Sequence, residues 1–303
     1  MSLQDAGDSY QNSLGILPAF VPSKVEEIPG GQHLLAPWAA IELRKLLTQT
    51  TRSAARLSGF ALKKYLRARM GLSDDTSLLV LLHGRDNLLE RFWQMDRQPF
   101  YEQLISHNIG AIMGTTFSVY GEHALRPPAH NLMQLRRHSH VLHELSRYEL
   151  TYIPNLYLRA REDEIELAAW LRDRTDIRQV ARDLSMSKGK RAKQIELEGL
   201  MRLLKRTGRT FNVILTGVSL ANSRRVMSRL HEDRHTCTIV TSDPILRAIK
   251  GRDLSGRQFG SRTTLYRRNV EKMDREIRRI DRSLGTGRAS KFPPIRVIQT
   301  IAA

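Results

Sequence analysis

Three aspartates stand at or just past the ends of apolar segments, where a carboxylate could act in acid–base or nucleophilic chemistry. They are Asp86, Asp183 and Asp243, and the last belongs to "TCTIVTSDPILRAIKGR" (236–252), in which a β-branched run meets helix-like sequence. Two carboxylates around one cavity can divide the roles of nucleophile and general acid–base, because their proximity raises the pKa of one above that of the other. Such a pair suits glycosyl transfer or the binding of Mg²⁺. Each aspartate could instead cap a helix or form a surface ion pair.

Other polar residues follow the same apolar segments and are candidates for binding a substrate. They are His83, Arg85, Ser118, Asn155, Tyr157, Ser219 and Ser242. In a barrel of parallel strands, the residues that follow the strands share one rim, which is where barrel enzymes have their active sites. The pattern therefore predicts a polar rim with carboxylates from three different strands.

Patterns that bind cofactors or metals are weak or absent. Cys237 is the single cysteine, which excludes an intrachain disulfide and a cysteine cage for zinc or iron–sulfur. His231, His235 and Cys237 form an H-x3-H-x-C pattern, but it falls where helix-like sequence becomes strand-like. No glycine-rich loop of the P-loop or dinucleotide-binding type is present. We expect no cofactor and no bound metal.

Apolar runs alternate with helix-like segments through the middle of the chain. Six strand–helix units are predicted, with strands within 77–84, 109–120, 150–158, 177–185, 210–219 and 236–243. The runs are almost continuously apolar, as expected of parallel strands buried on both faces. Upstream, 15–23 could be another strand with helices over 36–70 behind it, and 293–301 could supply one more strand. We predict an α/β fold, a (β/α) barrel of seven to eight parallel strands with a C-terminal basic helix; an open doubly wound sheet is the alternative.

The same pattern suggests three parts of the chain. Residues 1–76 would supply an N-terminal strand and basic helices that complete the barrel, and residues 77–252 would form the barrel core. Residues 253–303 would form the basic helix and a C-terminal tail.

The chain is strongly basic, with 49 Lys and Arg against 31 Asp and Glu, a net charge of +18 and a pI near 10.5. Such an excess predicts a polyanionic partner, because neutralising phosphates releases their counterions. We expect a nucleic acid, with DNA favoured over RNA. The candidate contacts are Arg267, Arg268, Lys272, Arg275, Arg278, Arg279, Arg282, Lys63 and Lys64.

Most of these cations lie on the predicted helix 263–284. Its apolar residues recur at alternating steps of four and three, as in a coiled-coil seam. They are Tyr266, Val270, Met273, Ile277, Ile280 and Leu284. The helix could pack on the body of the protein with a solvated basic face, clamp a nucleic acid, or pair with a second copy or a partner protein.

No apolar run approaches the ~18 residues that a membrane helix needs. The polar start "MSLQDAGDSYQNS" lacks the order of a secretory signal. We therefore expect no membrane partner and a cytoplasmic location.

Two stretches resemble a known superfamily. "LTGVS" (215–219) and "TSDPILRAIKGR" (241–252) resemble the last third of the TIM-barrel transglycosylases that exchange guanine for a 7-deazaguanine, and are closer to their DNA-modifying relatives than to the tRNA enzymes. Residues 126–158 resemble uncharacterised barrel proteins of phages and plasmids. The resemblance covers about residues 80–252, without the cysteine-rich zinc site of the tRNA enzymes.

This resemblance implies a reaction on a nucleobase. Asp243 or Asp183 would attack the sugar C1′ and release guanine, while Asp86 would handle protons. The side chains that would read the base edge are Ser118, Asn155 and Ser219. The target base would have to leave its stack.

The predicted function is therefore a barrel enzyme that exchanges or modifies a nucleobase in DNA. One alternative is a non-catalytic subunit that binds nucleic acid or assembles a larger complex, and another is a Mg²⁺-dependent nuclease or phosphodiesterase. Convergence of Asp86, Asp183 and Asp243 on one pocket would favour catalysis, whereas three separate helix caps would favour the inert subunit.

Overall fold

Two parallel sheets of four strands form the centre of the computed structural model, which describes residues 14–28, 32–48, 55–62, 64–119, 128–158, 161–185, 187, 189–258 and 261–299. One sheet has the order β3-β6-β7-β8, with β3 at Trp38–Glu42, β6 at Ser77–Leu81, β7 at Ala111–Met113 and β8 at Tyr152–Ile153. The other has the order β1-β11-β10-β9, with β1 at Phe20–Pro22, β11 at Thr236–Thr241, β10 at Asn212–Thr216 and β9 at Gln179–Asp183. The predicted α/β fold with parallel strands is confirmed.

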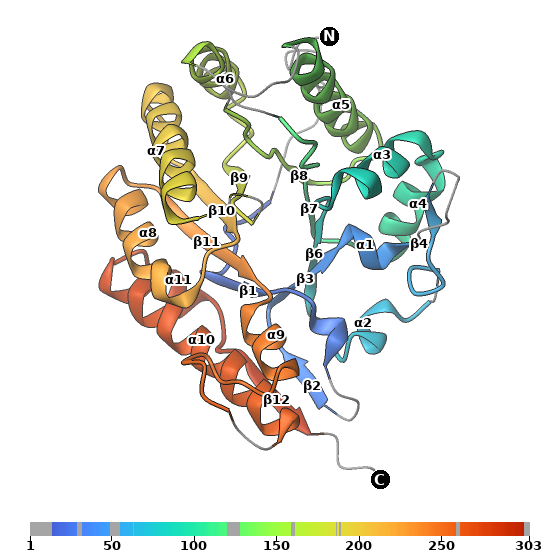
Figure 1. Cartoon of the computed structure of the whole chain (residues 1–303), viewed down its shortest axis with the longest axis vertical. Helices are drawn as coiled ribbons and strands as arrows, with labels where there is room; N and C mark the ends of the chain where they lie inside the picture. Colours follow the sequence, from blue (N-terminus) through green and yellow to red (C-terminus); the bar gives the residue numbers. More distant parts are fainter. Residues whose placement is uncertain are drawn as a thin grey trace.

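The edges of the two sheets meet at isolated parallel bridges. Ser23 pairs with Ala40 between β1 and β3, and Asn155 pairs with Ala181 between β8 and β9. Figure 1 shows the strands around the centre of the view, with the larger helices outside them. The arrangement is that of a TIM-barrel-like α/β fold.

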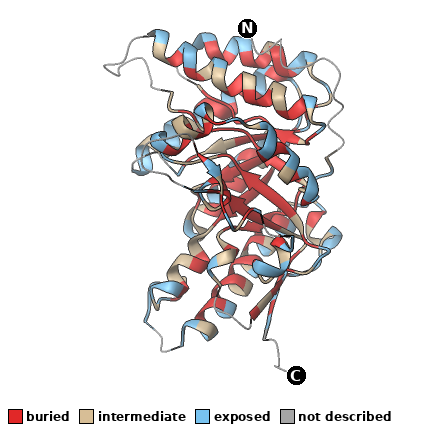
Figure 2. Cartoon of the chain, turned by 90° about the vertical axis from the view of Figure 1, so that its right-hand side faces the viewer, coloured by how far each residue is buried: buried red, intermediate tan, exposed pale blue. Residues whose placement is uncertain are grey.

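Each strand is buried on both faces, which explains the continuous apolar runs. Side chains from all eight strands, among them Val21, Leu79 and Ile214, form a small inner core. The alternate residues, such as Leu78 and Val213, pack against the helices in a larger outer core. Figure 2 shows the buried residues concentrated in the strands and on the inward faces of the helices.

The helices follow the strands in the predicted alternation. Their bounds are Asp86–Gln94 (α3), Gln98–Ser106 (α4), Pro128–Arg147 (α5), Arg161–Asp173 (α6), Lys190–Thr207 (α7), Leu220–Glu232 (α8) and Asp243–Ile249 (α9). Acidic residues in the first turn of α6 complement the positive end of its dipole. Helix α7 ends at Gly208, which has a φ of 68° and so forms the left-handed C-cap that glycine favours.

The N-terminal part of the chain differs from the prediction of helices over 36–70. It contains strand β3, the short helices α1 (Leu43–Leu46) and α2 (Leu66–Arg69), and a two-stranded ribbon of β4 (Leu47–Thr48) and β5 (Arg56–Leu57). A one-turn 3₁₀ helix, η2, spans Val25–Glu27. Ala39, Ala40 and Ile41 are all fully buried, so sheet contacts on both faces override the helix propensity of alanine.

The C-terminal strand also lies outside the parallel sheets. Strand β12 (Arg296–Gln299) pairs antiparallel with β2 (Gln32–Leu35) in a separate ribbon. The expectation that 293–301 adds a strand to the barrel is therefore wrong, because β3 supplies the eighth parallel strand instead.

The basic helix is α10 (Arg262–Ser283), followed by the short α11 (Arg288–Lys291). Its predicted seam is buried within the chain, except for half-buried Leu284. The helix packs against α8, α9, β1 and β12. The seam is therefore already covered. The prediction that it pairs with a second copy or a partner protein is corrected, because the helix packs through it on the body of the protein.

Replacing Ile277 by valine should lower the free energy of unfolding by about 1 kcal/mol, because it removes one buried methylene group. Chemical denaturation would measure the loss. The loss should be the same at every protein concentration, since the seam packs within one chain. A loss that varies with concentration would place the seam between two chains instead.

No helix in the described part of the chain is long and apolar enough to cross a bilayer. The division at residues 76 and 252 and the cytoplasmic location remain predictions.

Candidate functional site

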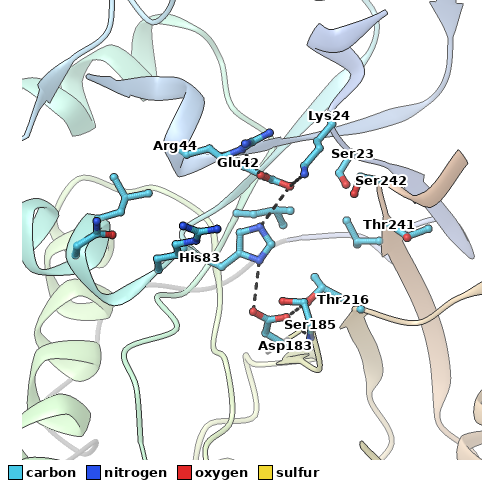
Figure 3. A pocket seen from close by; sticks show the side chains of 17 residues that line it. Ser23, Lys24, Glu42, Arg44, His83, Asp183, Ser185, Thr216, Thr241 and Ser242 are labelled. Carbon is cyan, nitrogen blue, oxygen red and sulfur yellow. Dashed lines mark hydrogen bonds and ion pairs between the residues drawn. The ribbon is translucent and has the colours of Figure 1, made fainter. Parts of the chain in front are cut away.

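A pocket of about 620 Å³ opens at the C-terminal ends of the parallel strands. Its walls come from the ends of β1, β3, β6, β9, β10 and β11 and from the loops that follow them. Figure 3 shows its polar side chains directed toward one another from these elements. Strands far apart in sequence therefore supply one polar cavity, at the end where such folds have their active sites.

His83 lies between two carboxylates in this pocket. Its Nε2 is 3.8 Å from Oε1 of Glu42, and its Nδ1 is 3.5 Å from Oδ2 of Asp183. Glu42 is the last residue of β3 and Asp183 the last residue of β9, so the two acids approach the imidazole from different sheets (Figure 3). Both separations are longer than a normal hydrogen bond, so each contact is a long, charge-assisted one.

The Asp183 carboxylate is held by several donors besides His83. Its Oδ1 accepts a 2.8 Å hydrogen bond from the backbone nitrogen of Ser185 and another from the hydroxyl of Thr216. The backbone nitrogen of Asp183 donates to Oδ1 of the buried Asn155 over 3.2 Å. The carboxylate is therefore held by Ser185, Thr216 and His83, and the backbone beside it is held by Asn155.

The Glu42 carboxylate contacts two further cations. Oε2 accepts from Nε of Arg44 at 2.7 Å, and Oε1 lies 3.8 Å from Nζ of Lys24. Lys24 has a φ of 60°, a left-handed conformation that costs a lysine of the order of 1 kcal/mol. The backbone at the end of β1 thus places its amine beside Glu42.

These contacts set the charges of the site. Burial opposes protonation of His83, but the hydrogen-bonding and charge of Asp183 and Glu42 outweigh it and raise its pKa to about 9. Burial likewise opposes ionisation of both acids. His83 and the donors around each acid nevertheless hold the pKa of Asp183 and of Glu42 below the usual range. At neutral pH the centre is an imidazolium between two carboxylates.

The loops after β9 and β10 meet at Gly217, where only glycine fits. Its φ is 75°, and a Cβ there would lie 2.4 Å from the backbone nitrogen of Ser185. Its carbonyl accepts a 2.8 Å hydrogen bond from Nζ of Lys193. Any side chain at 217 would displace the loop whose amide holds Asp183.

The structure places four of the predicted site residues in this pocket: His83, Arg85, Asp183 and Ser242. The others lie elsewhere. Asn155 is buried behind Asp183, and the buried Tyr157 hydroxyl donates to the carbonyl of Thr115. Ser219 is the N-cap of α8 and accepts from Nδ2 of Asn222 at 3.1 Å.

The other two aspartates do not line the pocket. Asp243 is the first residue of α9, and its Oδ1 accepts from Nε of Arg247 at 2.9 Å. Asp86 is the first residue of α3, is exposed, and accepts from the hydroxyl of Ser118. The expected convergence of three carboxylates does not occur, and "TSDP" is here the start of a helix.

The predicted basic contacts occupy several environments. Exposed side chains of α10 are Arg267, Arg268, Arg275, Arg279 and Arg282, and Lys272 is half-buried. Arg278 donates from Nη1 to the carbonyl of Phe292 at 2.9 Å, so it joins α10 to the C-terminal segment. Lys64 lies 5.7 Å from the ring centroid of Tyr65, and Lys63 lies outside the described residues.

The sequence patterns missed Glu42, Lys24 and Arg44. All three lie in the N-terminal part, where Trp38–Glu42 was assigned to a helix and not to a strand. An available indication was Pro37, which disfavours helix in the residue before it and introduces a short apolar run that ends in a carboxylate.

No family model matches the chain, and no curated protein matches it. Among solved structures, the chain is similar to a protein from Coccidioides immitis that is provisionally named a fructose-1,6-biphosphate aldolase. The two share 13% sequence identity with a TM-score of 0.47, over 90% of this chain and 93% of the other.

The predicted nucleobase exchange in DNA is wrong. Of the three carboxylates that were to share the reaction, only Asp183 lines the pocket. The alternatives of an inert nucleic-acid-binding subunit and a Mg²⁺-dependent nuclease are withdrawn with it. Among the described residues, no group of three or more His, Cys, Asp or Glu side chains is arranged to hold a metal ion. The resemblance to transglycosylases stays a prediction.

Proposed function

We propose that this protein is an enzyme that transfers a proton to a small polar substrate, with His83 as the general acid. The observation that carries the proposal is the imidazole held between Glu42 and Asp183 inside a pocket of about 620 Å³. Pockets of this volume are typical of small-molecule sites.

We further propose that the eight parallel strands close into a (β/α) barrel. The bridges Ser23–Ala40 and Asn155–Ala181 at both seams between the sheets support closure. The inner core to which every one of the eight strands contributes supports it as well. In such a barrel the pocket would occupy the usual catalytic end.

The charges determine the direction of proton transfer. With a pKa of about 9, His83 is protonated at neutral pH and can donate a proton but cannot accept one. Its Nε2 is 3.8 Å from Oε1 of Glu42, which is longer than a hydrogen bond, so a substrate oxygen that approaches Nε2 from the pocket would be a closer acceptor. Asp183 and Glu42 stay ionised and hold the ring in place, and solvent restores the proton after the reaction. General-acid catalysis of this kind contributes roughly 10²–10⁴-fold to a rate.

Replacing His83 by asparagine should lower turnover by about 100-fold or more, because the variant keeps a polar side chain but has no transferable proton. The test incubates the full chain with pools of small carbonyl, carboxylate and phosphate compounds and follows their masses over time.

His231→Asn is the matched control, since His231 is half-buried on α8 and does not line the pocket. It should leave turnover unchanged. Equal turnover by His83→Asn and the wild type would remove His83 from the chemistry.

A further inference from the structure

The charges that line the pocket do not balance. The lining residues include two acids, Glu42 and Asp183, against His83, Lys24, Arg44 and Arg85. With His83 protonated, the cations outnumber the acids by four to two. The surplus is local, since it counts only residues that face this cavity.

Both acids are already compensated. Glu42 contacts His83, Lys24 and Arg44. Asp183 contacts His83 and accepts hydrogen bonds from Thr216 and Ser185. Neither carboxylate therefore needs a cation from the ligand.

Two guanidinium groups keep donors unused. Arg44 binds Glu42 through Nε, and no hydrogen bond of its two Nη atoms occurs within the described residues. The side chain of Arg85 is exposed and makes no ion pair or hydrogen bond there. Arg44 follows β3 and Arg85 follows β6, and these strands are neighbours in one parallel sheet, so both residues leave the sheet at the same end.

A guanidinium group presents its N–H donors in a planar fork that matches a carboxylate or a phosphate. The remaining lining side chains include the hydroxyls of Ser23 and Ser242, which are neutral and suit alcohol or carbonyl groups of a ligand. An anionic end at the arginines would leave the rest of a small molecule in the cavity with His83.

We propose that the substrate of this pocket carries an oxyanion, a phosphate or carboxylate group, bound by Arg44 and Arg85. This inference rests on the proposed function, in which the same pocket is the active site. The anion places the substrate, and the proton from His83 acts elsewhere on it.

Replacing Arg85 by glutamine should weaken binding of inorganic phosphate or of malonate by about tenfold or more, the usual effect of losing a charge-assisted hydrogen bond. Arg44→Gln should have a similar effect. Isothermal titration calorimetry of the full chain measures each affinity, with glycerol as the neutral probe. The Arg85 side chain makes no ion pair or hydrogen bond within the described residues, so Arg85→Gln should fold normally. Circular dichroism checks this.

The matched control is Arg275→Gln, an exposed arginine of α10 that does not line the pocket. It removes the same charge from a chain of net charge +18 and should change affinity by less than about twofold. Tighter phosphate binding would identify a phosphate substrate, and tighter malonate binding a carboxylate substrate. Absence of binding by both anions, or equal losses in Arg85→Gln and Arg275→Gln, would overturn the proposal.

The two proposals fail separately. If neither anion binds while His83→Asn still loses turnover, the oxyanion is wrong and the general acid stands. If the anions bind through Arg85 while His83→Asn keeps full turnover, the binding site stands and the general acid is wrong.

Discussion

Replacing Arg288 by methionine is expected to lower the free energy of unfolding by about 3–5 kcal/mol, because it leaves a buried carboxylate without its counter-charge. Arg288 is only 2% exposed, and Asp281 is fully buried. The guanidinium donates to Oδ1 of Asp281 from Nη2 at 2.5 Å and from Nε at 3.2 Å. It also donates to Oδ1 of Asn212 at 3.0 Å and to the carbonyl of Cys237 at 2.8 Å. Denaturant titration of both proteins measures the difference.

The matched control is Arg279→Met, an exposed arginine on α10 whose ion pair among the described residues is with Glu276 at 2.8 Å. Its effect should lie within about 0.5 kcal/mol of zero. Replacing Arg288 and Asp281 together by apolar residues should recover much of the loss, since no lone charge then remains buried. Equal losses for Arg288→Met and Arg279→Met would show that the buried pair adds no stability.

This ion pair lies at the end of the sheet opposite the pocket. Asn212 begins β10 and Cys237 is near the start of β11, whereas Thr216 and Thr241 end these strands in the pocket. The pair joins α10 and α11 to the sheet without contacting the site. Variants at Arg288 should therefore affect stability and leave the chemistry of the folded protein unchanged.

The parallel strands could be predicted from sequence because burial on both faces requires almost continuously apolar residues. Each of the six central runs contains a strand of the structure, and the 15–23 run contains β1. The bounds are shorter than predicted; β8, for example, is only Tyr152–Ile153. Apolar residues past a strand end also enter the core, so hydrophobicity alone does not mark where pairing stops.

Strand β3 could not be separated from a helix by local pattern. Ala39 and Ala40 favour a helix in isolation, and the stretch is continuous with the helix-like residues that follow it. Only the neighbouring strands β1 and β6, distant in sequence, make an extended conformation favourable. Because the sequence pattern predicts a helix here, it does not place Glu42 at a strand end. It therefore does not predict the carboxylate that contacts His83 opposite Asp183.

The aspartates show the limit of a positional rule. Asp183, Asp86 and Asp243 all stand near the ends of predicted strands, yet only Asp183 faces the pocket. Asp183 is within its strand, so the pleat directs its side chain. Asp86 and Asp243 are first residues of helices, where a carboxylate is favoured by the helix dipole. Arg247, four residues after Asp243, was a visible indication of a local ion pair.

The seam of α10 illustrates a related ambiguity. Apolar residues spaced as in a coiled coil require a complementary surface, but the spacing does not say whether that surface is another chain or the same one. Here the chain itself supplies it, from α8, α9, β1 and β12.

The second large effect concerns pH. The free energy of unfolding should fall by about 3 kcal/mol more in the wild type than in His83→Asn as pH rises from 6 to 10. The folded-state pKa of His83, about 9, exceeds the ordinary 6.5. Its contribution is thus complete below pH 6.5 and lost as pH rises through about 9. Denaturant titrations across this range, on both proteins, measure the difference in slope.

At acidic pH, the free energy of unfolding changes with pH in the opposite direction. The lowered pKa values of Asp183 and Glu42 mean that their contribution is present above the ordinary carboxyl pKa and is lost as pH falls below it. His231→Asn, outside the pocket, should follow the wild type through the alkaline range. If His83→Asn also follows the wild type there, His83 is neutral in the folded protein at neutral pH. It would then have no proton to give, so this equilibrium experiment tests the proposed general acid without knowledge of the substrate.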